Sequence, residues 1–386
     1  MADRIGAGPG IRGLSKQRLC AETALAWVFS ACLAAISAYA AGVDPFTASS
    51  YVHSDSGHYL RIAQSGYEFF SCERLQGYDP AQWCGNGGWM PGYPLILKLL
   101  IALQMDRQAA GLLCSCGFYF GSLILLRLLI EDAAPGRDNF PCFLAASAFP
   151  GGIYYFGVFP ISLVMFLALL AMLLAVRERF LLASLAAAGG AFTYATGFLL
   201  SGVVAAAVLV ARDSPWPKRL CEAALYGAIG FAGLCAVMIM HAIILDHWNA
   251  FFLVQAKYGH AVHDPLATIG HVWQTAVDQR NNPEKFIGPA QSLIVCAVVG
   301  STLAYILVRF RQITRIEQIA AVHVALFWLF PLMMGNAVSL TRAEANLLPL
   351  VILLALLPRA AQSVVIATFA FLYFEVGVAF FKSVLV

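Results

Sequence analysis

The chain has 386 residues, of which 60% are hydrophobic and only 12% are charged. A water-soluble domain carries about a quarter charged residues, so this chain could not cover a water-facing surface. Its net charge of +3 comes from basic residues scattered over short loops, which gives no basis for nucleic-acid binding. The long apolar stretches are continuous, unlike the alternating strands of a membrane β-barrel. The composition therefore predicts an all-α, polytopic membrane protein.

The N-terminal segment is basic and leads into an apolar run. Arg4, Arg12, Lys16 and Arg18 precede residues 20–43, which are almost entirely hydrophobic. This run is longer than the core of a signal peptide and long enough to cross a bilayer of roughly 30 Å. It predicts a retained first transmembrane helix whose basic tail stays in the cytoplasm.

A polar stretch follows and forms the first extracytoplasmic loop, residues 44–104. Ser54 or Asp55 is expected to cap a short helix that ends at Gly66. The helix should lie along the membrane surface. Its lipid-facing residues are expected to be Tyr59, Ile62 and Ala63.

The rest of the chain predicts further spans, about 11 in all. Residues 93–104 are apolar but short, so they are expected to be interfacial or to begin a tilted helix. Residues 181–211 are long for one span and short for two, and their glycines favour two partial helices. The expected spans after the first are residues 109–130, 140–158, 160–176, 181–211, 220–246, 289–309, 319–337, 345–357 and 361–381.

The distribution of basic residues supports this topology. The expected cytoplasmic segments are short, yet they hold most of the lysine and arginine residues. The orientation puts residues 44–104 and a second loop, residues 247–288, on the outer face. We expect one transmembrane domain, residues 1–386, with no separate soluble domain.

Three side chains of the first loop could carry chemistry or hold the loop. Asp55 is an acid close to a membrane surface, which is costly unless the group is hydrated, paired or used. It could cap a helix, or it could serve as a general base. Cys72 and Cys84 are the only cysteines of this loop, and on an oxidising face they would form a disulfide rather than remain free thiols. No Cys-x-x-Cys pair occurs, and we expect no metal site and no cofactor.

Two segments resemble a known family. Asp55–Tyr67 (DSGHYLRIAQSGY) and Trp89–Leu95 (WMPGYPL) are similar to the signature of the PIG-V type mannosyltransferases, GPI mannosyltransferase II, and their bacterial relatives. These enzymes belong to the GT-C class of integral membrane glycosyltransferases. Tyr194 stands where the family often has Arg, and Met90 where an aromatic residue is usual. Weaker similarities to the family occur at Ala195–Gly197, Asn249–Gly259 and Ser339–Glu344.

The resemblance implies an inverting glycosyltransferase. It would take a sugar, expected to be mannose, from a polyprenyl-phosphate carrier and pass it to a lipid or glycan acceptor. The reaction would occur on the periplasmic side of a bacterial inner membrane, among membrane lipids, with Asp55 as the general base. The substrate-binding candidates are His58, Tyr59, Arg61, Trp89, Tyr93, Lys257, His260 and Arg342.

Each of these residues also has a simpler interpretation. Arg342 could instead pair with Glu344 or reach the membrane interface. Lys257 and His260 could lie on a solvated loop, and the aromatic residues could be ordinary interfacial side chains. Two alternative functions remain. The protein could be a lipid or solute transporter or flippase, or it could be a non-catalytic scaffold that binds lipid-linked sugar.

Overall fold

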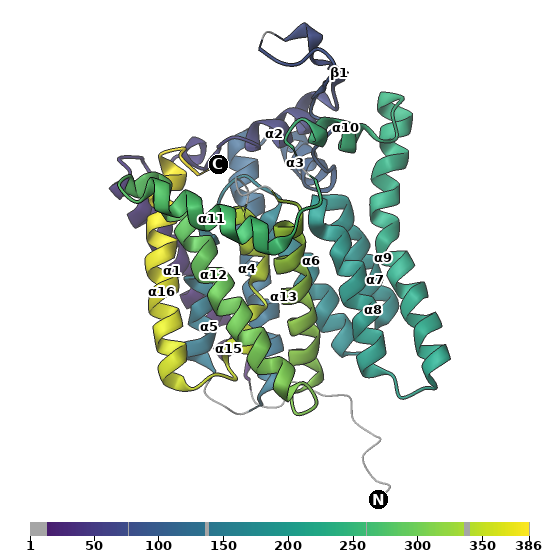
Figure 1. Ribbon diagram of the computed structural model, residues 1–386, viewed down its shortest axis with the longest axis vertical. Helices are drawn as coiled ribbons and strands as arrows, with labels where there is room; N and C mark the ends of the chain where they lie inside the picture. The colour runs from purple at the N-terminus through teal and green to yellow at the C-terminus, as the bar shows by residue number, and fades with distance from the viewer. Residues whose placement is uncertain (1–13, 76, 136–138, 260, 336–339, 386) are drawn as a thin grey trace, which may run out of the picture.

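The computed structural model describes residues 14–75, 77–135, 139–259, 261–335 and 340–385. These residues are mostly helical (Figure 1). Four shorter apolar helices accompany the longest ones: α3 (Gly92–Ala102), α6 (Ile161–Val176), α7 (Phe180–Thr193) and α8 (Leu199–Ala211). The chain is thus a membrane-embedded helical protein. The helices long and apolar enough to cross a membrane are α1 (Lys16–Ala40), α4 (Arg107–Ala133), α9 (Trp216–Leu245), α12 (Pro283–Arg309), α13 (Arg315–Met333) and α16 (Arg359–Phe381).

Burial separates the inner helices from the outer ones. Helix α6 is hydrophobic all round and mostly buried, and it packs against α4, α7 and α8. Helix α9 lies at the edge of the bundle and exposes Leu225, Ile239 and Ile243. Exposed leucine and isoleucine on a long apolar helix are compatible with lipid, since such side chains are favourable in the bilayer core.

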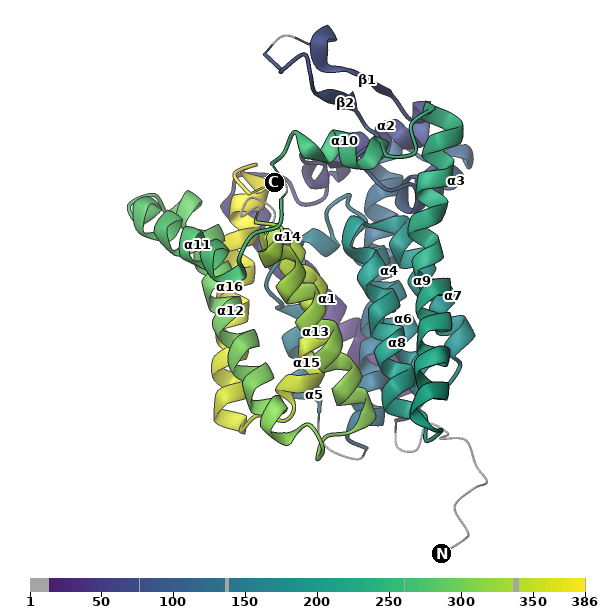
Figure 2. The same cartoon turned by 45° about the vertical axis from the view of Figure 1, so that its right-hand side comes forward.

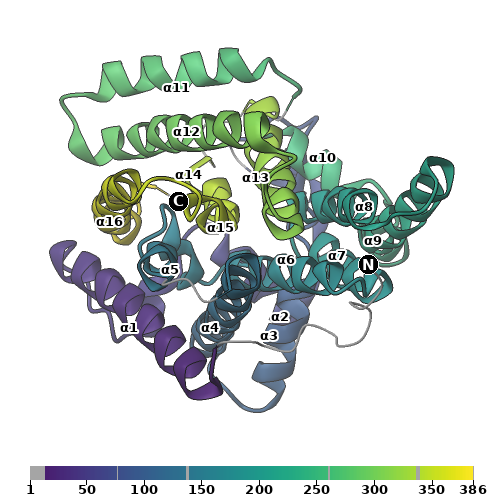
Figure 3. The same ribbon diagram turned by 90° about the horizontal axis from the view of Figure 1, so that it is seen from below.

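Two expected spans are not continuous helices. Residues 140–158 form α5 (Phe140–Ser147) and a 3-10 turn (Gly152–Tyr155), separated at Gly151 with φ +72°. Residues 345–357 form a 3-10 turn (Ala345–Leu347) and α15 (Leu350–Leu354), separated at Pro349. The broken segments α5 and α15 pack against each other inside the bundle (Figure 3). The backbone polar groups at these helix breaks are therefore covered by protein. A membrane protein requires this, because lipid cannot hydrogen-bond to them.

The segment 181–211 does form two helices. Helix α7 ends at Thr193, a 3-10 turn (Ala195–Phe198) follows, and α8 continues from Leu199. A Cβ atom at Gly197 would lie 2.0 Å from the carbonyl oxygen of Gly190, so only glycine permits this close approach. The backbone is thereby turned sharply beside Tyr194.

The first loop folds over one end of the bundle. It contains a 3-10 turn (Ala48–Tyr51), α2 (Ser56–Ser65), α3, and a hairpin of β1 (Phe69–Ser71) and β2 (Trp83–Gly85) that stands clear of the helices (Figure 1). Another 3-10 turn, Cys72–Arg74, follows β1. Helix α2 ends at Gly66 with φ +83°, as expected. Its expected lipid-facing side is wrong: Tyr59, Ile62 and Ala63 are buried in the protein core.

The second loop also contains helices. Helix α10 (Ala250–Ala256) lies below the hairpin, and α11 (Pro265–Gln279) packs against α12 and α13 and projects from the bundle (Figure 2). Helix α12 begins at Pro283, earlier than residue 289, and continues through Pro289. The short helix α14 (Leu340–Glu344) lies at the same end of the bundle. Loop segments distant in sequence therefore converge on one face.

Candidate active site

An ion pair joins the first loop to α14. Nη1 of Arg342 donates to Oδ2 of Asp55 at 2.6 Å, and the two residues are 287 positions apart in the sequence. The side chains are 17% and 24% exposed, respectively, so the pair is shielded yet reachable from solvent. Arg342 therefore pairs with Asp55 and not with Glu344, the partner considered from the sequence.

The local backbone turns the Asp55 side chain away from its own helix. Asp55 occupies the N-cap position of α2, but its side chain makes no capping hydrogen bond. The preceding residue, Ser54, has φ +40°, which is uncommon for a residue with a side chain. Ser56 Oγ accepts from the backbone N–H of His53 at 3.1 Å and stabilises the turn. The carboxylate is thereby left to face Arg342.

Aromatic residues surround the Arg342 guanidinium. It lies 5.5 Å from the ring centre of Phe159, and its side chain hydrogen-bonds with Tyr194. Burial opposes the charge of Arg342, but Asp55 and the nearby tyrosines outweigh it and raise the pKa. Tyr194 thereby supports the arginine of the ion pair.

His58 and Trp89 form one stacked unit beside Asp55. Their ring centres are 3.6 Å apart with an interplanar angle of 16°. The Tyr67 hydroxyl donates to the Trp89 carbonyl at 2.8 Å and helps hold this segment in place. Burial lowers the pKa of His58, and the opposing effect of Asp55 is smaller. The stack is therefore a neutral aromatic surface at neutral pH.

Tyr59 and Tyr93 are core residues of the loop. Tyr59 is 5% exposed and Tyr93 is fully buried, and their rings meet edge to face at 5.7 Å. The Tyr93 hydroxyl is 2.9 Å from Ser115 Oγ and donates to the Gly111 carbonyl at 3.1 Å, which ties α3 to α4. Tyr93 is thus committed to packing and is not positioned as an interfacial or sugar-stacking residue.

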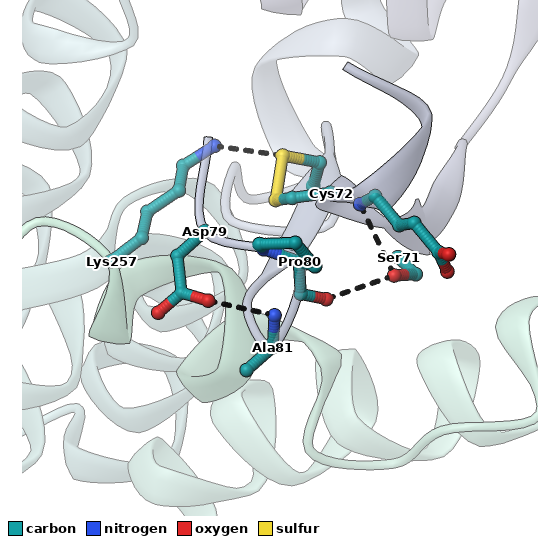
Figure 4. Close-up of a disulfide and its surroundings, with 8 residues drawn as sticks. Ser71, Cys72, Asp79, Pro80, Ala81 and Lys257 are labelled. Atoms are coloured by element: carbon teal, nitrogen blue, oxygen red, sulfur yellow. Dashed lines mark hydrogen bonds between the residues drawn. A yellow bond between two sulfur atoms is a disulfide. The ribbon is translucent and has the colours of Figure 1, made fainter. Parts of the chain in front are cut away.

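Lys257 lies at the edge of the site, beside the hairpin (Figure 4). Its Nζ is 4.0 Å from Cys84 Sγ and lies 5.0 Å from the ring centre of Tyr258. Partial burial lowers the pKa of Lys257. Its charge also opposes protonation of His58, as does that of Arg61, so these cations share one electrostatic environment.

Arg61 contributes to this electrostatic environment but makes no close ion pair with any described residue. Arg61 is largely exposed and lies 3.9 Å from Glu68, at the long limit of an ion pair. His260 lies outside the residues that the structure describes.

The hairpin is closed by a disulfide between Cys72 and Cys84 (Figure 4). The strands pair antiparallel, with Phe70 opposite Cys84. A Cβ at Gly85 would lie 2.1 Å from the Glu68 carbonyl oxygen, so the return of the chain after β2 needs glycine. The bridge thus fixes the segment that continues directly to Trp89.

A second acid, Glu344, was not predicted as a site residue. It is 6% exposed, Gln291 Nε2 donates to it at 2.7 Å, and Ser292 also hydrogen-bonds to it. Burial raises the pKa of Glu344 to about 7. The sequence signal was its place two residues after Arg342, but only the fold shows that it faces α12 and not the ion pair.

Within the described residues, no group of three or more His, Cys, Asp or Glu side chains could hold a metal ion. The positive charges around the segment that holds Asp55 and His58 are those of Arg342, which pairs with Asp55, and of Arg61 and Lys257, which act on His58. These could contact an anionic group such as a phosphate.

Comparison with known proteins does not assign the chain to a family. No protein-family model matches it, and no curated protein matches it significantly. Its function has to be inferred from the residues around Asp55 and Arg342.

Proposed function

We propose that this protein is an inverting glycosyltransferase of the GT-C type. It takes a sugar, mannose in the simplest case, from a polyprenyl-phosphate carrier and transfers it to a lipid or glycan acceptor. The observation that supports this most is the Asp55–Arg342 ion pair, at 2.6 Å and partly open to solvent. It brings together a carboxylate able to accept a proton and a guanidinium able to bind phosphate.

The two charges suit the two ends of the reaction. The acceptor hydroxyl gives its proton to Asp55 while its oxygen forms a bond to the anomeric carbon. The bond from that carbon to the phosphate oxygen breaks, and the phosphate keeps the electron pair and gains negative charge. Arg342, together with Lys257 at the edge of the site, would stabilise this charge, as positioned cations do in transition states.

The ion pair also supplies a resting state. Without substrate, Arg342 and Asp55 neutralise each other in a partly buried site. Donor binding would offer Arg342 a second anion, the phosphate. The positive charge of Arg342 would then be shared between the phosphate and Asp55. The Asp55 carboxylate would therefore become a better proton acceptor. Substrate binding and activation of the base are thereby linked.

The neighbouring side chains provide the remaining substrate contacts. His58 is half-buried and stacks on the buried Trp89, so the His58 ring can offer a flat face beside the acid to one face of a sugar ring. Tyr59 is buried in the core beneath the loop and packs edge to face against Tyr93. Arg61 and His260 remain predicted substrate contacts.

We place the site on the periplasmic face of a bacterial inner membrane, with the shorter helices completing about 11 membrane segments. The Cys72–Cys84 disulfide supports an outer, oxidising location, since such bonds are rare in the cytoplasm. The basic segments at the opposite end support a cytoplasmic location for that end.

A transporter would instead require charged residues along a pathway through the spans. The buried Arg127 of α4 is held by Glu22 at 2.6 Å and Glu131 at 3.1 Å, which joins α1 to α4. This cluster therefore has a structural role.

The direct test is to incubate the purified protein with a radiolabelled polyprenyl-phosphate-linked mannose and a bacterial membrane lipid extract. We expect label to move to a product that has the anomeric configuration opposite to that of the donor. A sugar nucleotide in place of the lipid-linked donor should give no product. No transfer from any polyprenyl-phosphate sugar, with folded protein, would overturn the proposal.

A further inference from the structure

A cavity of about 410 Å³ lies beside the ion pair on the same face of the molecule. It is bounded by α11, α12, α14 and the segment after α16. Its volume is in the range of sites that hold small ligands or headgroups. The lining residues are His271, Val272, Thr275, Gln279, Lys285, Gly288, Pro289, Ser292, Thr341, Val384 and Leu385.

The lining combines apolar side chains with hydrogen-bonding groups and the cation of Lys285. Thr275, Gln279 and Thr341 offer neutral hydrogen-bonding groups, and Lys285 offers an ammonium. Among the described residues that line the cavity there is no carboxylate. Of the neighbouring acids, Glu284 is engaged by Lys382 at 2.8 Å, and Glu344 accepts from Gln291 and hydrogen-bonds with the lining residue Ser292. The cavity is therefore suited to an anionic group that also carries hydroxyls.

The cavity wall is linked to both halves of the ion pair, by the backbone to Arg342 and by a side-chain contact to the segment of Asp55, although neither Asp55 nor Arg342 lines it. Thr341 directly precedes Arg342. Val384 follows Ser383, whose Oγ lies 3.1 Å from Nδ1 of His53, two residues before Asp55. A group bound in the cavity would therefore lie on the flank of the base.

A tyrosine contacts both sides of the cavity. The Tyr154 hydroxyl donates to the Leu385 carbonyl at 2.9 Å and lies 3.3 Å from Thr341 Oγ1. The two sides of the cavity are thus held together next to Arg342.

The cavity also lies at the level of a membrane surface. It opens between the start of the span α12 and helix α11, which exposes Leu266 at 74% and Trp273 at 61%. Exposed tryptophan and leucine on a short amphipathic helix are typical of the membrane interface. A ligand in the cavity can therefore keep its acyl chains in the bilayer.

We propose that this cavity binds the headgroup of an anionic phospholipid that carries hydroxyls, with Lys285 contacting the phosphate. Its role as the acceptor site rests on the glycosyltransferase function proposed above; lipid binding itself does not. A bound headgroup would present a hydroxyl toward Asp55. The shared chemistry is a phosphodiester with neighbouring hydroxyl groups.

Binding can be measured by native mass spectrometry of the purified protein with phosphatidylglycerol, phosphatidic acid or phosphatidylcholine. We expect phosphatidylglycerol to bind most tightly. Lys285→Ala removes a charge-assisted hydrogen bond and should weaken phosphatidylglycerol about tenfold. Val384→Trp, which fills the cavity, should abolish this binding. The matched controls are Arg280→Ala, a nearby exposed cation, and Val308→Trp, at the far end of α12; both should bind as wild type.

Several outcomes would overturn the inference. Equal binding of the three lipids would show that the site does not select an anionic headgroup with hydroxyls. A loss of phosphatidylglycerol binding in the control variants as large as in Lys285→Ala and Val384→Trp would show that the contact is not specific to the cavity. Displacement of the lipid by inorganic phosphate or glycerol 3-phosphate at millimolar concentration would show that a soluble phosphate, and not a lipid, is the ligand.

The two proposals can fail separately. Asp55→Asn should still bind phosphatidylglycerol, because Asp55 does not line the cavity. Sugar transfer without lipid binding in the cavity would overturn this inference alone. Lipid binding that Lys285→Ala and Val384→Trp impair, in a protein without transfer activity, would overturn the enzymatic proposal alone.

Discussion

Neither Asp55 nor Arg342 is unusual by itself. The proposed function depends on the contact between their two side chains. A partly buried charge is stabilised only when another charge or a set of hydrogen bonds compensates it. Here the guanidinium is contacted by Asp55, Tyr194 and the Phe159 ring. The planar guanidinium of arginine can hold a carboxylate and a phosphate on different edges, whereas the ammonium of lysine is a point charge.

This geometry predicts the effect of Arg342→Lys. The lysine keeps the positive charge but loses the fork, so kcat/KM for sugar transfer should fall roughly tenfold or more. Arg107→Lys is the matched control, since Arg107 donates to Gln64 in an exposed pair outside the site. If both variants transferred sugar at the wild-type rate, Arg342 would have no role in phosphate binding.

His58 predicts a dependence of stability on pH. Its folded-state pKa is lowered from 6.5 by burial, so the folded protein binds fewer protons than the unfolded chain. The stabilisation is therefore complete above pH 6.5 and is lost as the pH falls through the lowered value. His58→Phe, which can still stack on Trp89, should show a smaller decrease in melting temperature between pH 7 and 5. An unchanged decrease would contradict this assignment.

At the scale of elements, the hairpin and its disulfide hold the loop that carries the site. The bridge closes a segment with a separation of 12 residues. In the chain-entropy account, a loop of this size contributes about 3 kcal/mol. We expect Cys72→Ser/Cys84→Ser to lower the melting temperature and to weaken donor binding, since β2 leads directly to Trp89.

The control is Cys221→Ser, which removes a cysteine that forms no disulfide. Thiol titration of the denatured protein with and without reductant measures the bridge itself. Wild type should gain two reactive thiols on reduction, and the double variant none. Wild type with no gain would show that the bridge is not formed.

Some elements could be predicted from the sequence because their signals are local. Gly66 ends α2, and glycines accompany the division between α7 and α8. Residues 140–158 were expected to form one helix, because apolar composition alone does not reveal a break at Gly151. That break exists because the chain passes close to α14: a Cβ at Gly151 would lie 2.7 Å from the Thr341 carbonyl oxygen.

The site was only partly predictable, because its geometry depends on contacts between segments that are distant in the sequence. Asp55 and Arg342 were named as candidates, but their pairing depends on two loops that meet only in the folded protein. Tyr154 has no distinctive sequence context, and the contacts of Tyr194 and Glu344 come from tertiary packing that the sequence pattern does not reveal. The burial of α2 was missed because an amphipathic helix pattern does not distinguish lipid from protein as the covering surface.

At the scale of the whole molecule, the proposal depends on which way the bundle crosses the membrane. The loops that hold Asp55 and α11 lie at one end, and the segment between α8 and α9 lies at the other (Figure 2). The disulfide and the basic segments favour the first end as the outer one.

Cysteine labelling tests this orientation. In spheroplasts, a membrane-impermeant maleimide should label Asp278→Cys, which is exposed on α11. Asp213→Cys, whose side chain is 97% exposed, should react only after permeabilisation. The wild-type protein reports the background from its own free cysteines. The reverse labelling pattern would put the site in the cytoplasm and contradict the proposed reaction on the outer face.

The central claim is that one carboxylate accepts the acceptor's proton, and the transfer rate of Asp55→Asn tests it most directly. The rate of labelled sugar transfer should be compared between wild type, Asp55→Asn and Asp79→Asn, an exposed acid of the same loop. General-base catalysis predicts that Asp55→Asn is slower by about a hundredfold or more, while Asp79→Asn matches wild type. A folded Asp55→Asn protein that transfers sugar at the wild-type rate would contradict the account.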